Sequence, residues 1–353
     1  MLFEGLATEM LVHVFSSCSS PSDLYNLAST CHRFHRLYCS SRKLEFLSHA
    51  AETQYGPLED AVQLVTHNAS QPAHIVRQVP LSLALLSQII QVGRVVKRWE
   101  AIYPFKKWKD NFEDRRLLTP AECYIFRRAL YRLWLYSRAF HNIRHPRHSR
   151  LTRLTVLQRA DLLHNWTSAE LAEIADVRQV FRDTLSSNVC PSNGTIQRKY
   201  RTRFPETSHQ LLFNMHLNYP LPPPFFNQPK QQAAETHKYY AKYKPTPYYE
   251  PGCEGWGDDI AHYYVVEDML KLDPQQILWL KDNAPSKNQV QSFVEGLGEW
   301  FDNNGETFGQ TLEFVLHGRG EDVCDFMDAV ADGAIGVARR AVDISVSTCL
   351  KGV

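Results

Sequence analysis

The cysteine and histidine side chains near the N-terminus are the residues best suited to bind a metal. Cys31, His35 and Cys39 follow one another at intervals of four, with His32 beside them. Thiolate and imidazole groups are good zinc ligands, but a closed zinc site needs four ligands in a tetrahedral arrangement. One helix would place Cys31, His35 and Cys39 on a single side without fixing a fourth ligand. We therefore expect no metal site and no cofactor.

A second group of residues combines histidine with arginine. His141, His145 and His148 lie among four arginines, and this cationic neighbourhood opposes metal binding and better suits a phosphate or an acidic partner. The wider stretch 127–159 interleaves basic with aromatic residues, a pattern that can also contact nucleic acid. Because its aromatic residues recur at helical spacing, we expect them to face a core and expect no nucleic-acid partner.

The sequence contains few motifs that would support catalysis. Residues 252–257 lack the spacing and the strand-to-helix context of a dinucleotide-binding loop, and residues 302–306 lack the alternating ligands and distant glutamate of a calcium loop. We find no nucleophile elbow, zincin motif or phosphate-binding loop. The sequence therefore predicts that the chain is not an enzyme. The alternative, an enzyme built on residues 80–333, requires a pocket of convergent titratable residues.

The composition is that of an ordinary globular chain. The 353 residues are 44% hydrophobic and 22% charged, enough for a small module and a larger domain. The eight cysteines are scattered, the first residues do not resemble a secretory signal, and no apolar run reaches the roughly 18 residues of a membrane span. We expect a reducing compartment, the cytoplasm or the nucleus, and no membrane partner.

Opposite charges are concentrated in two stretches, although the formal net charge is only +1. Residues 94–159 contain 17 Lys and Arg against 5 Asp and Glu, whereas residues 250–332 contain 18 acidic against 4 basic residues. The two stretches could attract each other within the chain, or each could meet its own partner. Net charge bears on association and does not define a fold.

The first forty or so residues show the clearest helical pattern. Ser20 can cap a helix, Pro21 suits its first turn, and Asp23 places a carboxylate near unpaired amides. Apolar stripes at helical period precede and follow this start signal. They consist of Met10, Leu11, Val14, Phe15 and Cys18, and of Leu24, Leu27, Ala28, Cys31, Phe34, Leu37 and Tyr38. So short a segment has too small a core to be stable alone, so the rest of the chain or a partner must complete it.

Beyond this module the sequence predicts an all-α protein. Helices are expected over 43–66 with a break at Gly56-Pro57, and over 81–103, 120–142, 151–165, 168–186, 204–217 and, with interruptions, 260–332. Eight prolines exclude a continuous helix between 219 and 257, whereas the aromatic residues there argue against a freely disordered linker.

These patterns suggest four parts in chain order. We predict a three-helix module over 1–42, a helical domain over 43–217, a Pro/Tyr-rich irregular segment over 218–259, and an acidic helical part over 260–353. The sequence leaves open whether residues 43–353 form one domain or two.

The N-terminal pattern resembles the F-box. In that family an apolar helix follows Leu-Pro-x-Glu and ends near Ile-Phe; a turn with Asp-Leu, a helix ending in Cys-Arg-x-aromatic and a closing Leu come next. Residues 6–15, 20–28 and 31–37 match these elements in order and at the family's spacing. Ala7 stands where the family usually has Pro. The pattern also looks like the F-box of filamentous-fungal proteins, many of which have unclassified helical C-terminal regions.

The resemblance implies a scaffold role. F-box proteins bind a Skp-family adaptor, which joins them to a cullin–RING ubiquitin ligase, and the rest of the chain recruits a protein substrate. An amphipathic helical module suits this use, because a complementary groove can cover its apolar residues. The expected contact residues are Leu6, Ala7, Met10, Leu11, Val14, Phe15 and Leu24.

Two alternatives stay open. Leu11, Val14, Leu27, Cys31 and Phe34 could be core residues of the module. The chain could also be a helical protein–protein interaction protein whose degenerate F-box acts outside ubiquitin ligation.

Overall fold

The computed structural model describes residues 5–146, 149–150, 152–191, 213–216, 253–256, 266–285, 287–298, 300–301 and 304–339. The chain divides into two compact units. Unit 1 comprises residues 1–68 and 75–135, and unit 2 comprises residues 69–74 and 136–353. The helix α7 (Pro120–Phe140) contributes its first part to unit 1 and its last turns to unit 2.

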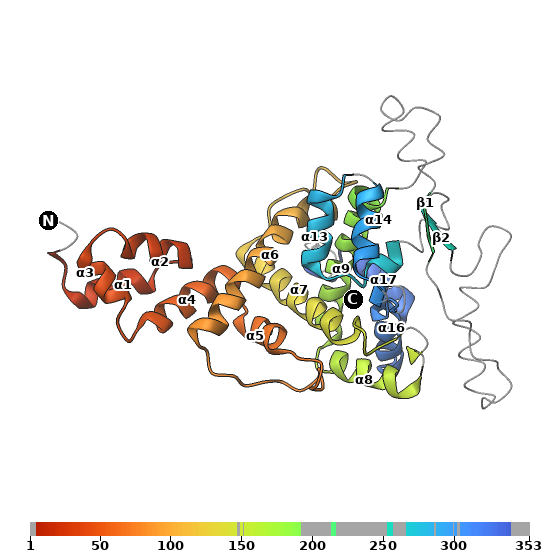
Figure 1. Ribbon diagram of the computed structural model, residues 1–353, viewed down its shortest axis with the longest axis horizontal. Helices are drawn as coiled ribbons and strands as arrows, with labels where there is room; N and C mark the ends of the chain where they lie inside the picture. The colour runs from red at the N-terminus through yellow and green to blue at the C-terminus, as the bar shows by residue number, and fades with distance from the viewer. Residues whose placement is uncertain are drawn as a thin grey trace, which may run out of the picture. The chain divides into compact units, whose positions relative to one another are not determined.

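Unit 1 is built of helices (Figure 1). Before α7 the chain forms α1 (Thr8–Ser16), α2 (Pro21–Ala28), α3 (His32–Tyr38), α4 (Lys43–Tyr55), α5 (Leu58–Thr66) and α6 (Leu83–Lys107). The break between α4 and α5 falls at Gly56-Pro57, because proline cannot continue the hydrogen-bonding pattern of a helix. The side chain of Ser82 begins α6 by accepting a hydrogen bond from the amide of Leu85.

The centre of unit 1 lies where α4, α5 and α7 meet α6. Gly93 of α6 faces the ring of Tyr55, and a Cβ atom at position 93 would come within 2.5 Å of that ring. Glycine therefore lets α4 and α6 approach closely. Tyr131 of α7 is buried and donates a hydrogen bond of 2.8 Å to the carbonyl oxygen of Tyr55. A single packing centre thus joins α4, α6 and α7.

Ion pairs also bind the helices of unit 1 together. Arg127 of α7 pairs with Glu100 of α6 at 2.8 Å, and Arg132 of α7 pairs with Asp60 of α5 at 2.8 Å. All four side chains are largely buried. Removing one partner of such a pair would leave a charge short of compensation, which costs more than losing a solvent-exposed pair.

Unit 2 is also helical. Its helices after α7 are α8 (Arg153–His164), α9 (Ser168–Thr184), a π-helical turn (Leu185–Val189), α13 (Pro274–Asn283), α14 (Lys287–Gly296), α16 (Phe308–Gly318) and α17 (Val323–Ala331). Two strands, β1 (Phe213–His216) and β2 (Cys253–Trp256), pair antiparallel, with Phe213 opposite Trp256. None of the described helices is long and apolar enough to cross a membrane.

The core of unit 2 contains a network of polar side chains. The hydroxyl group of Tyr136 lies 3.0 Å from that of Thr307 and 2.9 Å from that of Thr311. Arg159 of α8 is almost fully buried and donates a hydrogen bond of 3.0 Å to the Thr311 hydroxyl. The ring of His141, at the end of α7, lies 3.3 Å from the Thr307 hydroxyl. The network therefore connects α7, α8 and α16.

A buried lysine connects two further segments of unit 2. The ammonium group of Lys271 bonds to the carboxylate of Asp268 at 2.7 Å, to the carbonyl oxygen of Asn304 at 2.8 Å and to that of Phe301. It also lies 3.7 Å from the centre of the Phe301 ring. Because its partners use all three ammonium protons, this charge can be buried without unsatisfied donors.

The structure confirms the all-α fold class, and the helices that the sequence predicted around residues 43–66, 81–103, 120–142, 151–165 and 168–186 are present. The helix expected over 204–217 is wrong at 213–216, where the backbone pairs with 253–256 instead. Pairing with a segment far along the chain is not visible in local periodicity. The expected irregular segment 218–259 lies outside the described residues, apart from β2.

We predict that His141 makes unit 2 sensitive to acid. Burial, followed by the positive charges of Lys271, Arg159 and Arg178, lowers the pKa of His141 from 6.5 to about 3. The unfolded chain then binds more protons between these values, so the free energy of unfolding falls as the pH drops below 6.5. Between pH 7 and pH 5 this one histidine should lower the free energy of unfolding by about 2 kcal/mol.

Urea unfolding of wild type and of His141→Gln at both pH values measures this contribution. Between pH 7 and pH 5 the free energy of unfolding should fall by about 2 kcal/mol less in the variant than in wild type. The matched control is His164→Gln, at an exposed histidine of α8, which should retain the wild-type difference. A His141→Gln curve parallel to the wild-type curve would contradict the prediction.

Candidate partner-docking face of the N-terminal module

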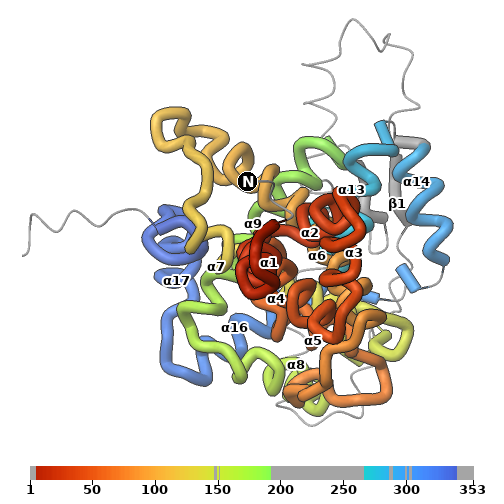
Figure 2. Tube along the Cα trace, turned by 90° about the vertical axis from the view of Figure 1, so that its left-hand side faces the viewer, coloured from red at the N-terminus to blue at the C-terminus, as the bar shows by residue number. Residues whose placement is uncertain are grey.

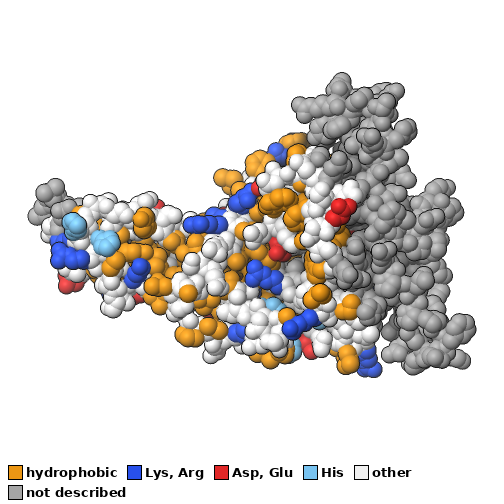
Figure 3. All heavy atoms as spheres, viewed as in Figure 1, with side chains coloured by type: hydrophobic (Ala, Val, Ile, Leu, Met, Phe, Trp, Pro, Cys, Tyr) orange, Lys and Arg blue, Asp and Glu red, His pale blue; other side chains and the backbone are white. Residues whose placement is uncertain are grey.

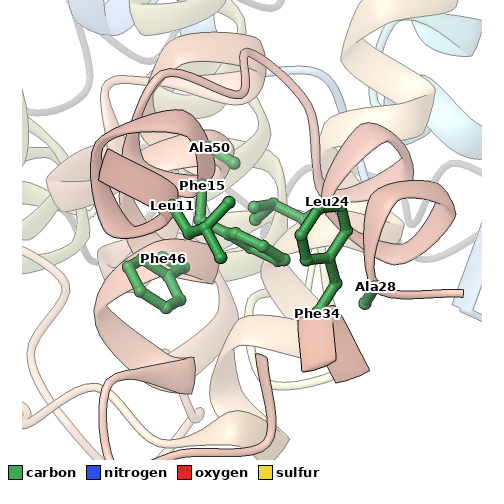
Figure 4. Packing of buried hydrophobic residues seen from close by; sticks show 7 residues of the cluster. All are labelled: Leu11, Phe15, Leu24, Ala28, Phe34, Phe46 and Ala50. Carbon is green, nitrogen blue, oxygen red and sulfur yellow. The ribbon is translucent and has the colours of Figure 1, made fainter. Parts of the chain in front are cut away.

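Helices α1 to α4 form a small cluster around a hydrophobic core. Its fully buried members are Leu11, Phe15, Leu24, Ala28, Phe34, Phe46 and Ala50, and their side chains converge in Figure 4. The ring of Phe15 lies at the centre of this core. It meets the Phe34 ring edge to face at 6.2 Å and the Phe46 ring at 5.5 Å. Aromatic pairs in such orientations contribute more than their buried area alone.

Helix α4 completes this core. Phe46 and Ala50 are both on α4, are 1% and 0% exposed, and cover the inner side of α1. The same helix ends at Tyr55, in the centre of unit 1. The small module is therefore completed by the rest of the chain, and its orientation is fixed to α4.

Local signals explain where the short helices begin. The hydroxyl group of Ser20 accepts a hydrogen bond of 3.0 Å from the amide of Asp23, and Pro21 occupies the first turn of α2, as the sequence predicted. Ala7 precedes α1 with φ −58° and ψ 150° and caps it without a side-chain hydrogen bond. The guanidinium group of Arg33 on α3 donates a hydrogen bond of 2.7 Å to the carbonyl oxygen of Leu6. This bond ties the residues before α1 to α3.

The seven expected contact residues fall into two groups. Leu11, Phe15 and Leu24 are at most 1% exposed and belong to the core, so we reassign them from direct contact to support of the surface. The physical reason is that Phe46 of α4 packs against the apolar side of α1, a contact that the sequence analysis did not predict. The remaining four are Leu6, Ala7, Met10 and Val14.

These four residues lie at or near the surface. Leu6 is half-buried and packs against the core, whereas Ala7 is exposed and Met10 is 54% exposed. Val14 is half-buried and is not part of the core cluster. Because positions 7, 10 and 14 follow at steps of three and four, they share one side of α1. We call Ala7, Met10 and Val14 the outer face of α1.

The sequence did not identify every exposed apolar residue of the module. Tyr25 of α2 is 65% exposed, and it lies off the apolar stripe that Leu24 and Ala28 belong to. An aromatic residue off a helical stripe is the signal that could have pointed to it. Figure 3 shows hydrophobic side chains at the surface of this module, among a few Lys, Arg and His side chains.

The cysteine and histidine residues that the sequence analysis considered as metal ligands lie on and beside α3. The sulfur of Cys39 lies 3.8 Å from Nε2 of His35, while Cys31 precedes α3 as its N-terminal cap residue. Within the described residues no group of three or more His, Cys, Asp and Glu side chains could hold a metal ion. Burial raises the pKa of the Cys18 thiol, and the nearby Asp23 raises it further, which opposes a nucleophilic thiolate there.

We predict that Phe46→Ala destabilises the module although position 46 lies outside the first three helices. Removing a fully buried ring leaves a cavity beside Phe15 and should lower the free energy of unfolding by about 3 kcal/mol. Urea unfolding followed by circular dichroism measures the loss. Phe112→Ala is the control, because Phe112 is 71% exposed and its removal, with the loss of its contact to Arg115, should change stability by less than about 1 kcal/mol. Equal losses for the two variants would show that α4 does not complete the core.

Comparisons with known proteins identify this segment. The family model F-box-like matches residues 8–44, which span α1 to α3 and the first residues of α4. No curated protein and no solved structure matches the chain. The family match covers the first three helices of the module, so the chain contains an F-box-like domain.

Proposed function

We propose that the chain is a ubiquitin-ligase adaptor. Its F-box-like domain docks a Skp-family protein, and through it a cullin, while the rest of the chain recruits a protein substrate. The observation that carries the proposal is the coincidence of the F-box-like match with the outer face of α1, where apolar side chains are left outside the core. F-box-like domains generally act in adaptors that bind Skp-family proteins.

The geometry of α1 suits helix-in-groove recognition. Met10 and Val14 are one helical turn apart and lie outside the core cluster, so a groove could cover both together. Met10 is flexible and polarisable, which lets it adapt to an apolar partner surface. Beneath them Leu11 and Phe15 are locked in the core, so the face is held in place before binding.

F-box proteins are typically adaptors and not enzymes, and we propose a non-catalytic role for this chain. The proposed compartment is the cytoplasm or the nucleus, where the ubiquitin machinery operates, and a filamentous-fungal type of F-box remains a prediction.

A second candidate function is a helical interaction protein whose degenerate F-box acts outside ubiquitin ligation. Ala7 favours that candidate, because the family usually has proline there.

We predict that Met10→Asp, Val14→Asp strongly weakens adaptor binding without unfolding the chain. The two carboxylates would be buried without partners in the complex, which should weaken binding by about 3 kcal/mol or more, roughly a hundredfold. A pull-down of the purified Skp-family adaptor by the purified full-length chain, followed by isothermal titration, measures the change. Both positions are partly exposed in the free chain, so its stability should change little.

The matched control is Ser87→Asp, Gln91→Asp, which places the same two charges one turn apart on an exposed side of α6. This variant should bind the adaptor as wild type does. If wild type does not bind the adaptor, the ubiquitin-ligase proposal fails and the second candidate function takes its place. If both double variants bind equally well, the outer face of α1 is not the docking surface.

We predict that Ala7→Pro tightens adaptor binding. The φ angle of −58° at Ala7 already matches the angle that a proline ring imposes, and position 7 precedes the first helical residue. Proline should therefore stabilise the start of α1 by roughly 0.5 to 1 kcal/mol through the unfolded chain. Its ring also adds apolar surface to the outer face of α1, so affinity should rise a few-fold in the same titration. Unchanged affinity would show that position 7 is not part of the contact.

A further inference from the structure

A second group of exposed apolar side chains lies in unit 1, away from the F-box-like domain. Phe105 ends the exposed side of α6, and Phe112 and Leu117 follow in the connection to α7, which Figure 2 shows as a loop between these helices. The three side chains are 60%, 71% and 82% exposed. Three large apolar residues so exposed within one short segment are unusual for a surface that meets only water.

The aromatic rings are held in place by an arginine. The guanidinium carbon of Arg115 lies 4.5 Å from the centre of the Phe112 ring and 5.6 Å from that of the Phe105 ring. Arg115 also donates a hydrogen bond of 3.3 Å to the carbonyl oxygen of Trp108. Such cation–π contacts order the two rings before a ligand arrives. Pre-ordered aromatic and arginine side chains are the residue types that dominate binding energy at protein interfaces.

The α6 side of this surface is basic, whereas three exposed acidic residues adjoin Phe112 in the connection. On α6 the exposed positions 94, 98, 101 and 105 recur at steps of three and four, so Arg94 and Arg98 lie on the same side as Phe105. Residues 94–116 contain eight Lys and Arg against four Asp and Glu. Of the four acidic residues, Glu100 is turned to the core and pairs with Arg127 and Lys97. Asp110, Glu113 and Asp114 lie in the connection, where Asp114 accepts a hydrogen bond from Asn111.

We propose that this surface binds an acidic protein segment with apolar anchors. The surface consists of Arg94, Arg98, Phe105, Phe112 and Leu117, and is called here the α6–α7 surface. Its arginines attract Asp and Glu side chains, and its exposed rings and leucine receive apolar side chains of the same segment. The span from Arg94 to Phe105 is about 16 Å along the helix, which a short extended peptide can cover. This proposal deepens the proposed function. The role of the α6–α7 surface in recruiting a substrate rests on the chain being a ubiquitin-ligase adaptor.

Selection from a random peptide library tests the chemistry of the ligand. The full-length chain is presented to displayed peptides of about twelve residues, which reach up to about 40 Å when extended. The enriched sequences should be rich in Asp and Glu and should contain Leu, Ile or aromatic residues. Enrichment of basic or uncharged sequences, or no enrichment, overturns the proposal.

Variants then test the location of the site. The most enriched peptide is synthesised with a fluorescent label, and its affinity is measured by anisotropy. Phe112→Ser, Leu117→Ser should weaken binding about tenfold or more, and so should Arg94→Glu, Arg98→Glu. The matched control is Leu154→Ser, which removes an equally exposed leucine (76%) from α8 in unit 2 and should leave the affinity unchanged. Equal affinity for wild type and both surface variants overturns the assignment.

Two further measurements distinguish a protein ligand from nucleic acid and the α6–α7 surface from the adaptor contact. Single-stranded DNA serves as a competitor, and the proposal expects it to displace the peptide only weakly. Because bases can stack on exposed aromatic rings, full displacement would mark the surface as a nucleic-acid site and overturn the proposal. The surface variants are also titrated with the Skp-family adaptor and should bind it as wild type does. Failure of the adaptor titration therefore contradicts the ubiquitin-ligase role, whereas failure of the peptide selection contradicts only the α6–α7 surface.

Discussion

The burial of Phe15 is the constraint on which the N-terminal module depends. Three helices as short as α1, α2 and α3 cannot enclose an aromatic ring of this size, and the ring is nevertheless 1% exposed. Phe46 of α4 covers it at 5.5 Å, so the module is stable only as part of a longer chain. The family match ends at residue 44, two residues before this contact, and thus omits a side chain that the core requires.

The same burial decides which residues are left for a partner. Since Leu11 and Phe15 turn toward Phe46, the neighbouring side of α1 carries Ala7, Met10 and Val14. A helix with apolar residues on two sides removes all of them from water only when both sides are covered. In unit 1 the core covers one side, and in the proposed function an apolar partner groove covers the other.

The sequence predicted the helices well and the contacts between them less well. Start signals are local: Ser20 caps α2 as predicted, and Thr167 with Glu170 forms a reciprocal capping box at the start of α9. Contacts between distant segments leave no local signal. The cover of Phe15 by Phe46 and the burial of Arg159 against Thr311 became visible only in the folded chain.

The exposure of individual apolar side chains could be predicted even less well than the contacts. A periodic apolar stripe indicates a buried side, so Leu11 and Phe15 were identified as apolar positions but could not be assigned to core or contact. Phe112 and Leu117 follow no periodic stripe, because they lie in a connection and not in a helix, and neither was singled out. Their exposure depends on how Arg115 and the ends of α6 and α7 place the connection.

Helix α4 links the two proposed surfaces of unit 1. Its first part supplies Phe46 and Ala50 to the core under the outer face of α1, and its last residue, Tyr55, packs against Gly93 of α6. The α6–α7 surface begins one residue later, at Arg94. Because a glycine contact this close leaves little room for sliding, α1 and α6 should keep a fixed relation through α4. An adaptor on α1 and an acidic segment on α6 would then be held at a constant distance, which is what a scaffold for transfer between two bound proteins requires.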